Sequence, residues 1–227
     1  MNKNILLIAD LVSQSKNEFI FIWNGLLPSF KEVEIMKIVC LCGKSASGKN
    51  KISELAQNNF NIKEAISHTT RPRRTGEGDI YNFMSIKEFK QMKKDNKFIE
   101  TRIYNTKEGQ WCYGLSKEAI DLNSDNNYLV ILDMKGLLSL KDYLIEIGKI
   151  DCLTSVYVYA SSQVRLLRSL NREGDMTDKQ VTEVVRRFQA DEKDFLGIED
   201  YIDYVLINND EKGLEEAKKL FKSILEE

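Results

Sequence analysis

Short apolar runs alternate along the chain with longer segments whose apolar residues recur at helical spacing. Residues 37–42 (KIVCLC) predict a buried strand, and residues 50–58 predict a helix because Ile52, Leu55 and Ala56 share one face. Short runs rich in β-branched or aromatic residues predict further strands at 128–133, 155–159 and 204–207. Helical patterns lie at 86–95, 117–122, 137–147, 162–171, 178–195 and 211–225. This alternation predicts an α/β fold with a mostly parallel central sheet and helices on both faces.

Composition limits the classes of function. The chain has 227 residues, 42% of them hydrophobic, which suffices for one α/β domain. A net charge of -2 favours neither nucleic acid nor an anionic membrane, so we expect neither as a partner. We expect a soluble protein, because charged or polar residues interrupt every apolar run before it reaches the roughly 18 residues that a membrane span needs.

Cysteine and histidine usage favours a cytoplasmic protein without a histidine metal site. The four cysteines have no C-x-x-C spacing, which predicts reduced thiols. His68 is the sole histidine, which argues against multi-histidine metal sites and Ser-His-Asp catalysis. Near the N-terminus, Asp10 interrupts the apolar run 5–9, so we do not expect export. Residues 1–35 form either an added strand and helix or an extension, and their role stays open.

A glycine loop follows the first predicted strand. Gly43-Lys44-Ser45-Ala46-Ser47-Gly48-Lys49 comes directly after residues 37–42 and opens the next helix, which is the context that a phosphate-binding loop requires. Its backbone N–H groups and the helix N-terminus would bind the triphosphate of ATP, and Lys49 would reach the β- and γ-phosphates. The loop therefore predicts a nucleotide kinase or another NTPase.

Asn50 departs from the usual pattern, in which Ser or Thr follows the lysine and binds Mg²⁺. Two interpretations remain open. The amide oxygen of Asn50 either binds Mg²⁺, directly or through water, or Asn50 caps the helix while water and phosphate complete the metal shell.

A second cluster suits a monophosphate. Hydroxyls and three arginines are concentrated within residues 67–83, and guanidinium groups bind phosphate oxygens in pairs. The run resembles the S-x-T-T-R-x-x-R-x-G-E-x-x-G-x-x-Y-x-F signature of the guanylate kinase family, and the resemblance extends from about Met36 to the C-terminus. It implies that the GMP phosphate is held by Ser67, Arg71, Arg74, Tyr81 and Tyr113.

The resemblance also implies a base site. Ser67, Glu100 and Asp133 fall on positions that read the guanine edge, and Asp133 is also a candidate Mg²⁺ ligand. A carboxylate suits guanine because N1–H and the 2-amino group are adjacent donors. Residues 102–111 make the spacing from Glu100 to Tyr113 longer than is usual in the family, and Leu115 replaces a hydroxyl residue. Both departures put the choice among GMP, dGMP and analogues in doubt.

The same resemblance implies a lid. Arg172 and Arg187 match arginines that close over ATP and assist catalysis with Lys49, and Asn208 lies in a run that resembles the loop near adenine. For Arg165 and Arg168, a lid role and a solvated helix surface both stay open. The expected organisation is a three-layer P-loop NTPase fold over 36–227, with core segments 36–66 and 128–227, a GMP-binding subdomain at about 67–127 and a lid at about 165–187.

The expected activity is Mg²⁺-assisted transfer of phosphate from ATP to GMP or dGMP, by a monomer or homodimer. One alternative is a related kinase with another nucleoside monophosphate acceptor. The other is a catalytically silent, protein-binding module of the same fold.

Overall fold

The computed structural model describes residues 36–73, 78–106, 109–173 and 176–226, except for the side chains of Arg172, Glu173 and Lys179. Residues 1–35, which the sequence left without a role, lie outside this description.

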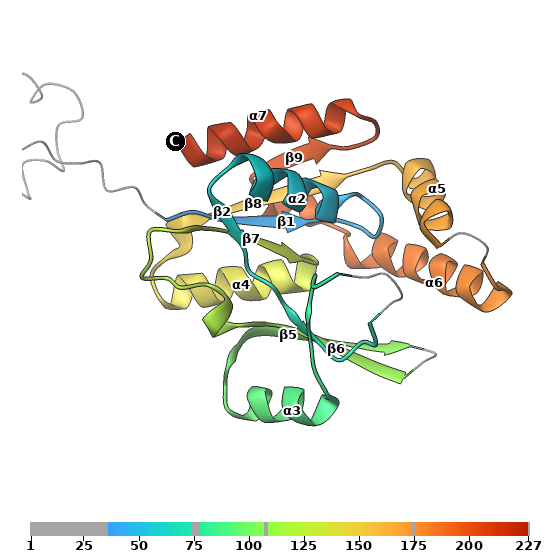
Figure 1. The fold of residues 1–227 in the computed structure, drawn as a ribbon, viewed down its shortest axis with the longest axis horizontal. Coiled ribbons are helices and arrows are strands. Elements are labelled where there is room, and N and C mark those ends of the chain that lie inside the picture. Colours follow the sequence, from blue (N-terminus) through green and yellow to red (C-terminus); the bar gives the residue numbers. More distant parts are fainter. Residues whose placement is uncertain (1–35, 74–77, 107–108, 174–175, 227) are drawn as a thin grey trace, which may run out of the picture. The chain divides into compact units, whose positions relative to one another are not determined.

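A five-stranded parallel sheet forms the centre of the described part, in the order β2-β7-β1-β8-β9 (Figure 1). Its strands are, in chain order, β1 (Ile38–Cys42), β2 (Ile62–Glu64), β7 (Asn127–Leu132), β8 (Leu153–Tyr159) and β9 (Tyr204–Ile207). Because β1 is central and parallel to both neighbours, the loop that follows it lies at the carboxyl edge of the sheet, where ligands bind in such folds.

Alternate side chains of β1 pack on opposite faces of the sheet. Ile38, Cys40 and Cys42 belong to one buried cluster and Val39 and Leu41 to another. The first cluster includes helix α4 (Met134–Glu146), and the second includes helices α2 (Lys49–Asn59) and α7 (Lys212–Glu226). This arrangement confirms the predicted α/β fold with helices on both faces of a parallel sheet.

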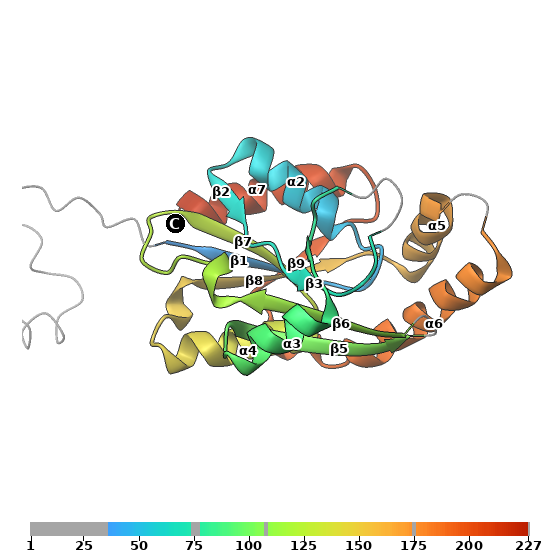
Figure 2. The same ribbon diagram turned by 60° about the horizontal axis from the view of Figure 1, so that its bottom comes forward.

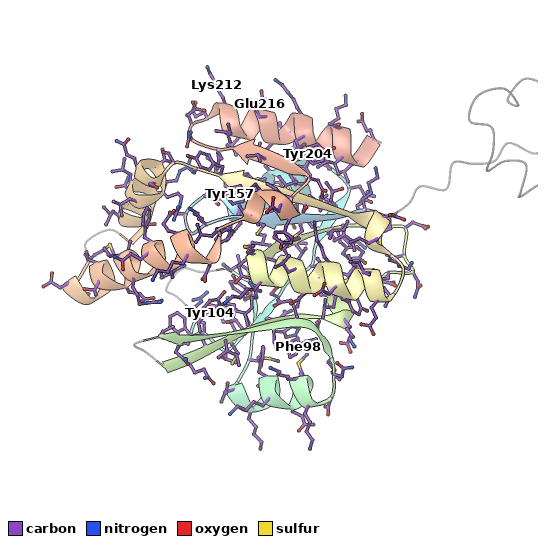
Figure 3. All side chains as sticks on the ribbon, turned by 180° about the vertical axis from the view of Figure 1, so that it is seen from behind. Phe98, Tyr104, Tyr157, Tyr204, Lys212 and Glu216 are labelled. Atoms are coloured by element: carbon purple, nitrogen blue, oxygen red, sulfur yellow. The ribbon has the colours of Figure 1, made fainter. Side chains whose placement is uncertain are left out.

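A second, four-stranded sheet has the order β4-β3-β6-β5. Its strands are β3 (His68–Thr69), β4 (Asn82–Phe83), β5 (Phe98–Thr106) and β6 (Gly109–Ser116). Helix α4 contacts β5 from one side, and α3 (Ile86–Lys94) lies on the other side (Figure 1), so that α3 comes to the front in Figure 2. Phe98 of β5 stacks on Phe89 of α3 with ring centroids 4.6 Å apart. Phe98 is labelled in Figure 3, where the molecule is seen from behind.

The longer spacing after Glu100 belongs to the β5–β6 hairpin. The two strands pair antiparallel from Phe98 opposite Ser116 out to Thr106 opposite Gly109. The added residues therefore lengthen two paired strands. This hairpin brings the side chains of Arg102 and Tyr104 close to Asp133, which follows β7 of the central sheet.

The helix predicted at 117–122 is wrong. The structure has a single 3-10 turn there, η1 (Lys117–Ala119), and Ile120 is extended, with φ -128° and ψ 108°. Ile120 is buried in the cluster that includes α4. Burial of this side chain outweighs the weak helical preference of a six-residue run.

The remaining helices follow the predicted ones closely. They are α5 (Ser162–Glu173) and α6 (Asp178–Asp194), with two further 3-10 turns, η2 (Ile150–Cys152) and η3 (Ile198–Tyr201). Among the described residues, no helix is both long and apolar enough to cross a membrane.

Candidate active site

The glycine loop closes tightly around the start of α2. Gly48 is the N-cap residue and has φ +100°, a left-handed conformation that favours glycine. A Cβ atom at Gly48 would lie 2.2 Å from Nδ2 of Asn208. Asn208 Nδ2 donates to the carbonyl of Ser47 at 2.7 Å, and both residues are buried. Asn208, which the sequence assigned to ATP binding, therefore supports the loop backbone.

Lys49 lies within the loop. Its Nζ donates to the carbonyl oxygens of Gly43, at 2.6 Å, and Lys44, at 3.1 Å. Burial lowers the pKa of Lys49, although Cys42 and Asp191 oppose the shift. A partly buried ammonium group whose hydrogen-bond partners among the described residues are carbonyl oxygens is suited to an anionic ligand, because an anion would offset its desolvation.

Helices α5 and α6 both contact this loop. Asp191 of α6 accepts from the Ser45 N–H at 2.6 Å, and Glu192 accepts from Lys44 Nζ at 2.5 Å. Arg165 of α5 pairs with both carboxylates and donates through Nε to the carbonyl of Ser45 at 3.0 Å. The Arg165 side chain is 2% exposed, so it is not a solvated surface charge.

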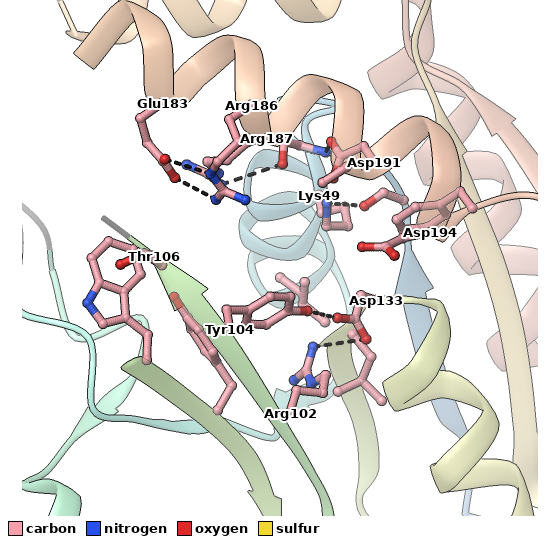
Figure 4. Close-up of a pocket in the computed structure, with 18 of the residues that line it drawn as sticks. Lys49, Arg102, Tyr104, Thr106, Asp133, Glu183, Arg186, Arg187, Asp191 and Asp194 are labelled. Atoms are coloured by element: carbon pink, nitrogen blue, oxygen red, sulfur yellow. Dashed lines mark hydrogen bonds and ion pairs between the residues drawn. The ribbon is translucent and has the colours of Figure 1, made fainter. Parts of the chain in front are cut away.

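Arg187 approaches the same loop from α6, with Nη2 3.5 Å from Ser45 Oγ, while its neighbour Arg186 pairs with Glu183 (Figure 4). The side chain of Arg172, the other predicted lid arginine, lies outside the described residues.

The predicted monophosphate cluster is brought together. Ser67 and Arg71 are each 5% exposed. The Arg71 guanidinium carbon lies 5.7 Å from the Tyr81 ring centroid, and the Tyr81 and Tyr113 rings meet edge to face at 5.6 Å. Arg74, the remaining member of the set, lies outside the described residues.

Glu100 and Asp133 are joined by a residue that the sequence did not single out. Arg102 donates through Nε and Nη2 to the two carboxylate oxygens of Glu100, both at 2.9 Å, and its Nη1 lies 3.3 Å from Asp133 Oδ1. Tyr104 donates its hydroxyl to Asp133 (Figure 4). The Leu115 N–H also donates to Glu100, at 3.1 Å.

These charges shift one another's pKa values. Burial alone would raise the pKa of Asp133, but the positive charge of Arg102 and the hydrogen bonds from Tyr104 and Gly136 together outweigh burial, and the pKa is lowered. For Glu100 burial prevails over Arg102, and the pKa is raised. Burial would lower the pKa of Arg102, but Asp133 and Glu100 raise it, so Arg102 stays charged.

One cavity of about 230 Å³ connects these groups. Its walls include Lys49 from the glycine loop, Tyr113 and Arg102 from the hairpin, Asp133 at the start of α4, and Arg187 from α6. Asn50 lines a smaller adjoining cavity with Ser67 and Tyr81. Asn50 therefore faces the predicted monophosphate cluster, next to the phosphate loop.

The sequence contained a signal for Arg102 and Tyr104. In a strand, residues i, i+2 and i+4 point to the same face, so Arg102 and Tyr104 lie beside Glu100 once β5 extends through them. The sequence pattern did not predict that residues 102–106 continue the strand, so the position of Arg102 and Tyr104 beside Glu100 was not foreseen. Asp191 had no such signal, because its contact with Ser45 spans 146 residues.

The described residues offer few side-chain ligands for a metal ion. Among the described residues, no group of three His, Cys, Asp or Glu side chains is arranged to hold a metal ion. Asp133 already faces the cation of Arg102, which argues against its predicted role as a Mg²⁺ ligand. Mg²⁺ commonly needs few protein ligands when phosphates and water supply the rest.

A phosphate loop at the carboxyl edge of a parallel sheet, sharing one cavity with the tyrosines of the predicted monophosphate cluster, defines a P-loop nucleotide kinase fold. A family model described as guanylate kinase matches residues 35–227. The chain belongs to the guanylate kinase family, as the sequence resemblance predicted.

Individual relatives agree with this assignment. A guanylate kinase of Rickettsia prowazekii is 32% identical over 179 residues, which cover 76% of this chain and 83% of that protein. One from Caldanaerobacter subterraneus is 28% identical over 179 residues, covering 76% of this chain and 80% of that protein. The crystal structure of guanylate kinase from Anaplasma phagocytophilum has a TM-score of 0.58 at 22% identity, covering 84% of this chain and 85% of that one, and it supports the fold.

Proposed function

We propose that this chain is an enzyme that transfers the γ-phosphate of ATP to GMP. The observation that carries the proposal is the single cavity that Lys49 of the phosphate loop shares with Tyr81 and Tyr113 of the monophosphate cluster. Phosphoryl transfer depends mainly on alignment and on neutralising charge, and a shared cavity lets two phosphates meet.

Each end of the cavity has a proposed role. The loop 43–49 holds the ATP phosphates, and the ammonium group of Lys49 remains in contact with the transferred phosphoryl group as negative charge develops on it. Arg187 and Arg172 close over ATP from the lid, and Asn208 keeps the loop in its binding shape through Ser47. Asn50 is the candidate to hold Mg²⁺, directly or through water, and the ion would offset the negative charge of the phosphates.

At the acceptor end, Ser67, Arg71, Arg74, Tyr81 and Tyr113 are proposed to hold the GMP phosphate. This phosphate is already ionised at neutral pH, so the reaction needs no general base from the protein. Glu100 and Asp133 form the charged end of the acceptor site together with Arg102. We place the enzyme in the cytoplasm, as a monomer or homodimer, with small nucleotides as its partners.

A panel of nucleoside monophosphates in a coupled ADP-release assay tests the function. GMP should stimulate ADP release by wild-type protein with Mg²⁺ present. Lys49→Ala should lower turnover by about 100-fold or more while GMP affinity stays within a few-fold, because Lys49 serves the transition state. Lys51→Ala, an exposed lysine two residues further on in α2, is the matched control and should retain activity.

The outcomes separate the alternatives. Stimulation by a different monophosphate, with none by GMP, would identify another acceptor. Folded protein that binds GMP without any ADP release would favour the silent binding module. Equal turnover by wild type and Lys49→Ala would remove the phosphate loop from the mechanism.

A further inference from the structure

The charged end of the acceptor site presents an arginine to the cavity. Arg102 lines the cavity, whereas the Glu100 side chain is only 1% exposed and has both oxygens engaged by Arg102. The second carboxylate, Asp133, receives the Tyr104 hydroxyl, the Gly136 N–H and the ion pair from Arg102. A ligand entering the cavity therefore meets the guanidinium of Arg102 before it meets Glu100.

Arg102 has N–H donors that its two carboxylate partners do not use. A guanidinium group carries five N–H donors. Hydrogen bonds to the described residues use Nε–H and one Nη2–H, and Nη1 forms an ion pair with Asp133, which leaves at least one N–H on each terminal nitrogen. Glu100 and Asp133 fix the plane of the group from two sides, and Tyr113 lies 6.0 Å from its central carbon. The guanidinium is thus held in place on the cavity wall with N–H donors that its carboxylate partners do not use.

We propose that Arg102 is the specificity-determining residue of the acceptor site and that it donates a hydrogen bond to the 6-oxo group of guanine. The proposal rests on the proposed function, because it names how the acceptor base is read. Guanine offers an acceptor at position 6, and arginine is a frequent partner for that oxygen. Adenine places an amino group there, so two donors would face each other and the base is rejected. Glu100 and Asp133 are positioning residues that hold the guanidinium.

Two acceptor analogues separate reading of position 6 from reading of position 2. IMP retains the 6-oxo group and lacks the 2-amino group. The monophosphate of 6-thioguanosine retains N1–H and the 2-amino group but has sulfur, a weak acceptor, at position 6. Wild-type kcat/KM should be within about tenfold for IMP and GMP, because the proposed hydrogen bond survives in both. It should be roughly tenfold or more lower for the 6-thio analogue.

The variant Arg102→Met removes the donors and keeps much of the side-chain volume. It should lower kcat/KM for GMP and IMP in parallel, by roughly 10- to 100-fold, and should bring the ratio of GMP to the 6-thio analogue close to one. Lys97→Met is the matched control, since Lys97 is an exposed residue just before β5 whose pairing with Glu118 is long, at 3.9 Å. It should leave both ratios unchanged.

Removal of one buried charge leaves Glu100 and Asp133 without their cation, so the double variant Glu100→Gln/Arg102→Met, which removes one charge of each sign, is measured alongside. It should show the same loss of preference for the 6-oxo group. Thermal unfolding of each variant confirms that folded protein is compared, and the wild-type ratios test the proposal without any substitution.

Three results would overturn the proposal. The first is a variant that keeps the wild-type preference for GMP over the 6-thio analogue. The second is a wild-type rate for IMP more than about 100-fold below that for GMP, which would mean that the 2-amino group is read instead. The third is a change confined to the GMP to IMP ratio in Arg102→Met, which would make Arg102 only a counter-ion for Glu100. If wild-type protein phosphorylates neither GMP nor IMP, the proposed function itself fails.

Discussion

Substituting Gly48 by alanine tests the shape of the phosphate loop at its tightest point. Gly48 has φ +100°, where a residue with a Cβ is strained by about 1–3 kcal/mol. The new Cβ would also lie 2.2 Å from Asn208 Nδ2, so Asn208 must move and lose its 2.7 Å hydrogen bond to the Ser47 carbonyl. The Ser47 carbonyl keeps its 3.3 Å contact from Arg168, but the buried Asn208 amide loses its acceptor, which costs about 1–3 kcal/mol more.

Together these effects give a loss of roughly 2–6 kcal/mol in the free energy of unfolding. For a domain of this size, each kcal/mol lowers Tm by about 2–4 °C, so Gly48→Ala should lower Tm by roughly 5–20 °C. Thermal unfolding followed by circular dichroism measures the shift, and urea titration at one temperature gives the free energy directly.

Gly109→Ala isolates the backbone strain, because Gly109 has a similar φ of +119° and, apart from its chain neighbours, no described residue has an atom within 4 Å of the built Cβ. It should cost only about 1–3 kcal/mol. Asn208→Ala isolates the lost hydrogen bond. The double variant Gly48→Ala/Asn208→Ala removes the clash, so its cost should be less than the sum of the two single costs. Equal losses for Gly48→Ala and Gly109→Ala, or strict additivity in the double variant, would refute the reasoning.

Three further predictions concern charge and burial. Because the pKa of Asp133 is lowered in the folded protein, its carboxylate stabilises the fold above about pH 3.8, and this stability is lost as the pH falls through the lower folded pKa. Asp133→Asn should therefore flatten the acid side of a plot of urea midpoint against pH. Parallel curves for wild type and variant would contradict this. Burial raises the pKa of Cys42 to about 12, so its thiol should resist a disulfide reagent at pH 8 until urea unfolds the protein, and rapid labelling of Cys42 in native protein would contradict its burial. Because Asp191 holds the Ser45 N–H that we assign to ATP phosphate, Asp191→Asn should lower KM for ATP by about threefold to tenfold, and a raised KM would mean that the carboxylate assists binding.

The central part of the fold could be predicted from local patterns. Residues 37–42 and 50–58 are short, strongly patterned segments joined by a motif that demands strand, loop and helix in that order, and the structure has β1 and α2 there. The small second sheet was harder to predict. Its strands β3 and β4 have two residues each, too few for any alternation of apolar and polar positions to be recognised.

The acceptor site was predicted in its anchors but not in its connections. Glu100 and Asp133 could be named from the sequence because each lies in a recognisable motif. Arg102 was not named, because its role depends on a hairpin that places it between Glu100 on β5 and Asp133 at the N-cap of α4. The resemblance assigned the carboxylate oxygens of Glu100 to guanine, whereas in the structure both oxygens accept hydrogen bonds from Arg102. A buried charge is paired when possible, and here the pairing determines what the cavity presents.

The phosphate loop illustrates the same dependence on distant residues. A loop that turns its N–H groups inward toward phosphate must turn carbonyl groups outward, and those carbonyls need donors. In this chain the Ser47 carbonyl accepts from Asn208 and from Arg168 at 3.3 Å, and the Ser45 carbonyl accepts from Arg165. The motif 43–49 therefore determines what faces the nucleotide, while residues more than 100 positions away hold the outer side of the loop. Because Arg165 and Arg168 come from helix α5, which belongs to the predicted lid, a movement of that helix would be transmitted directly to the loop backbone.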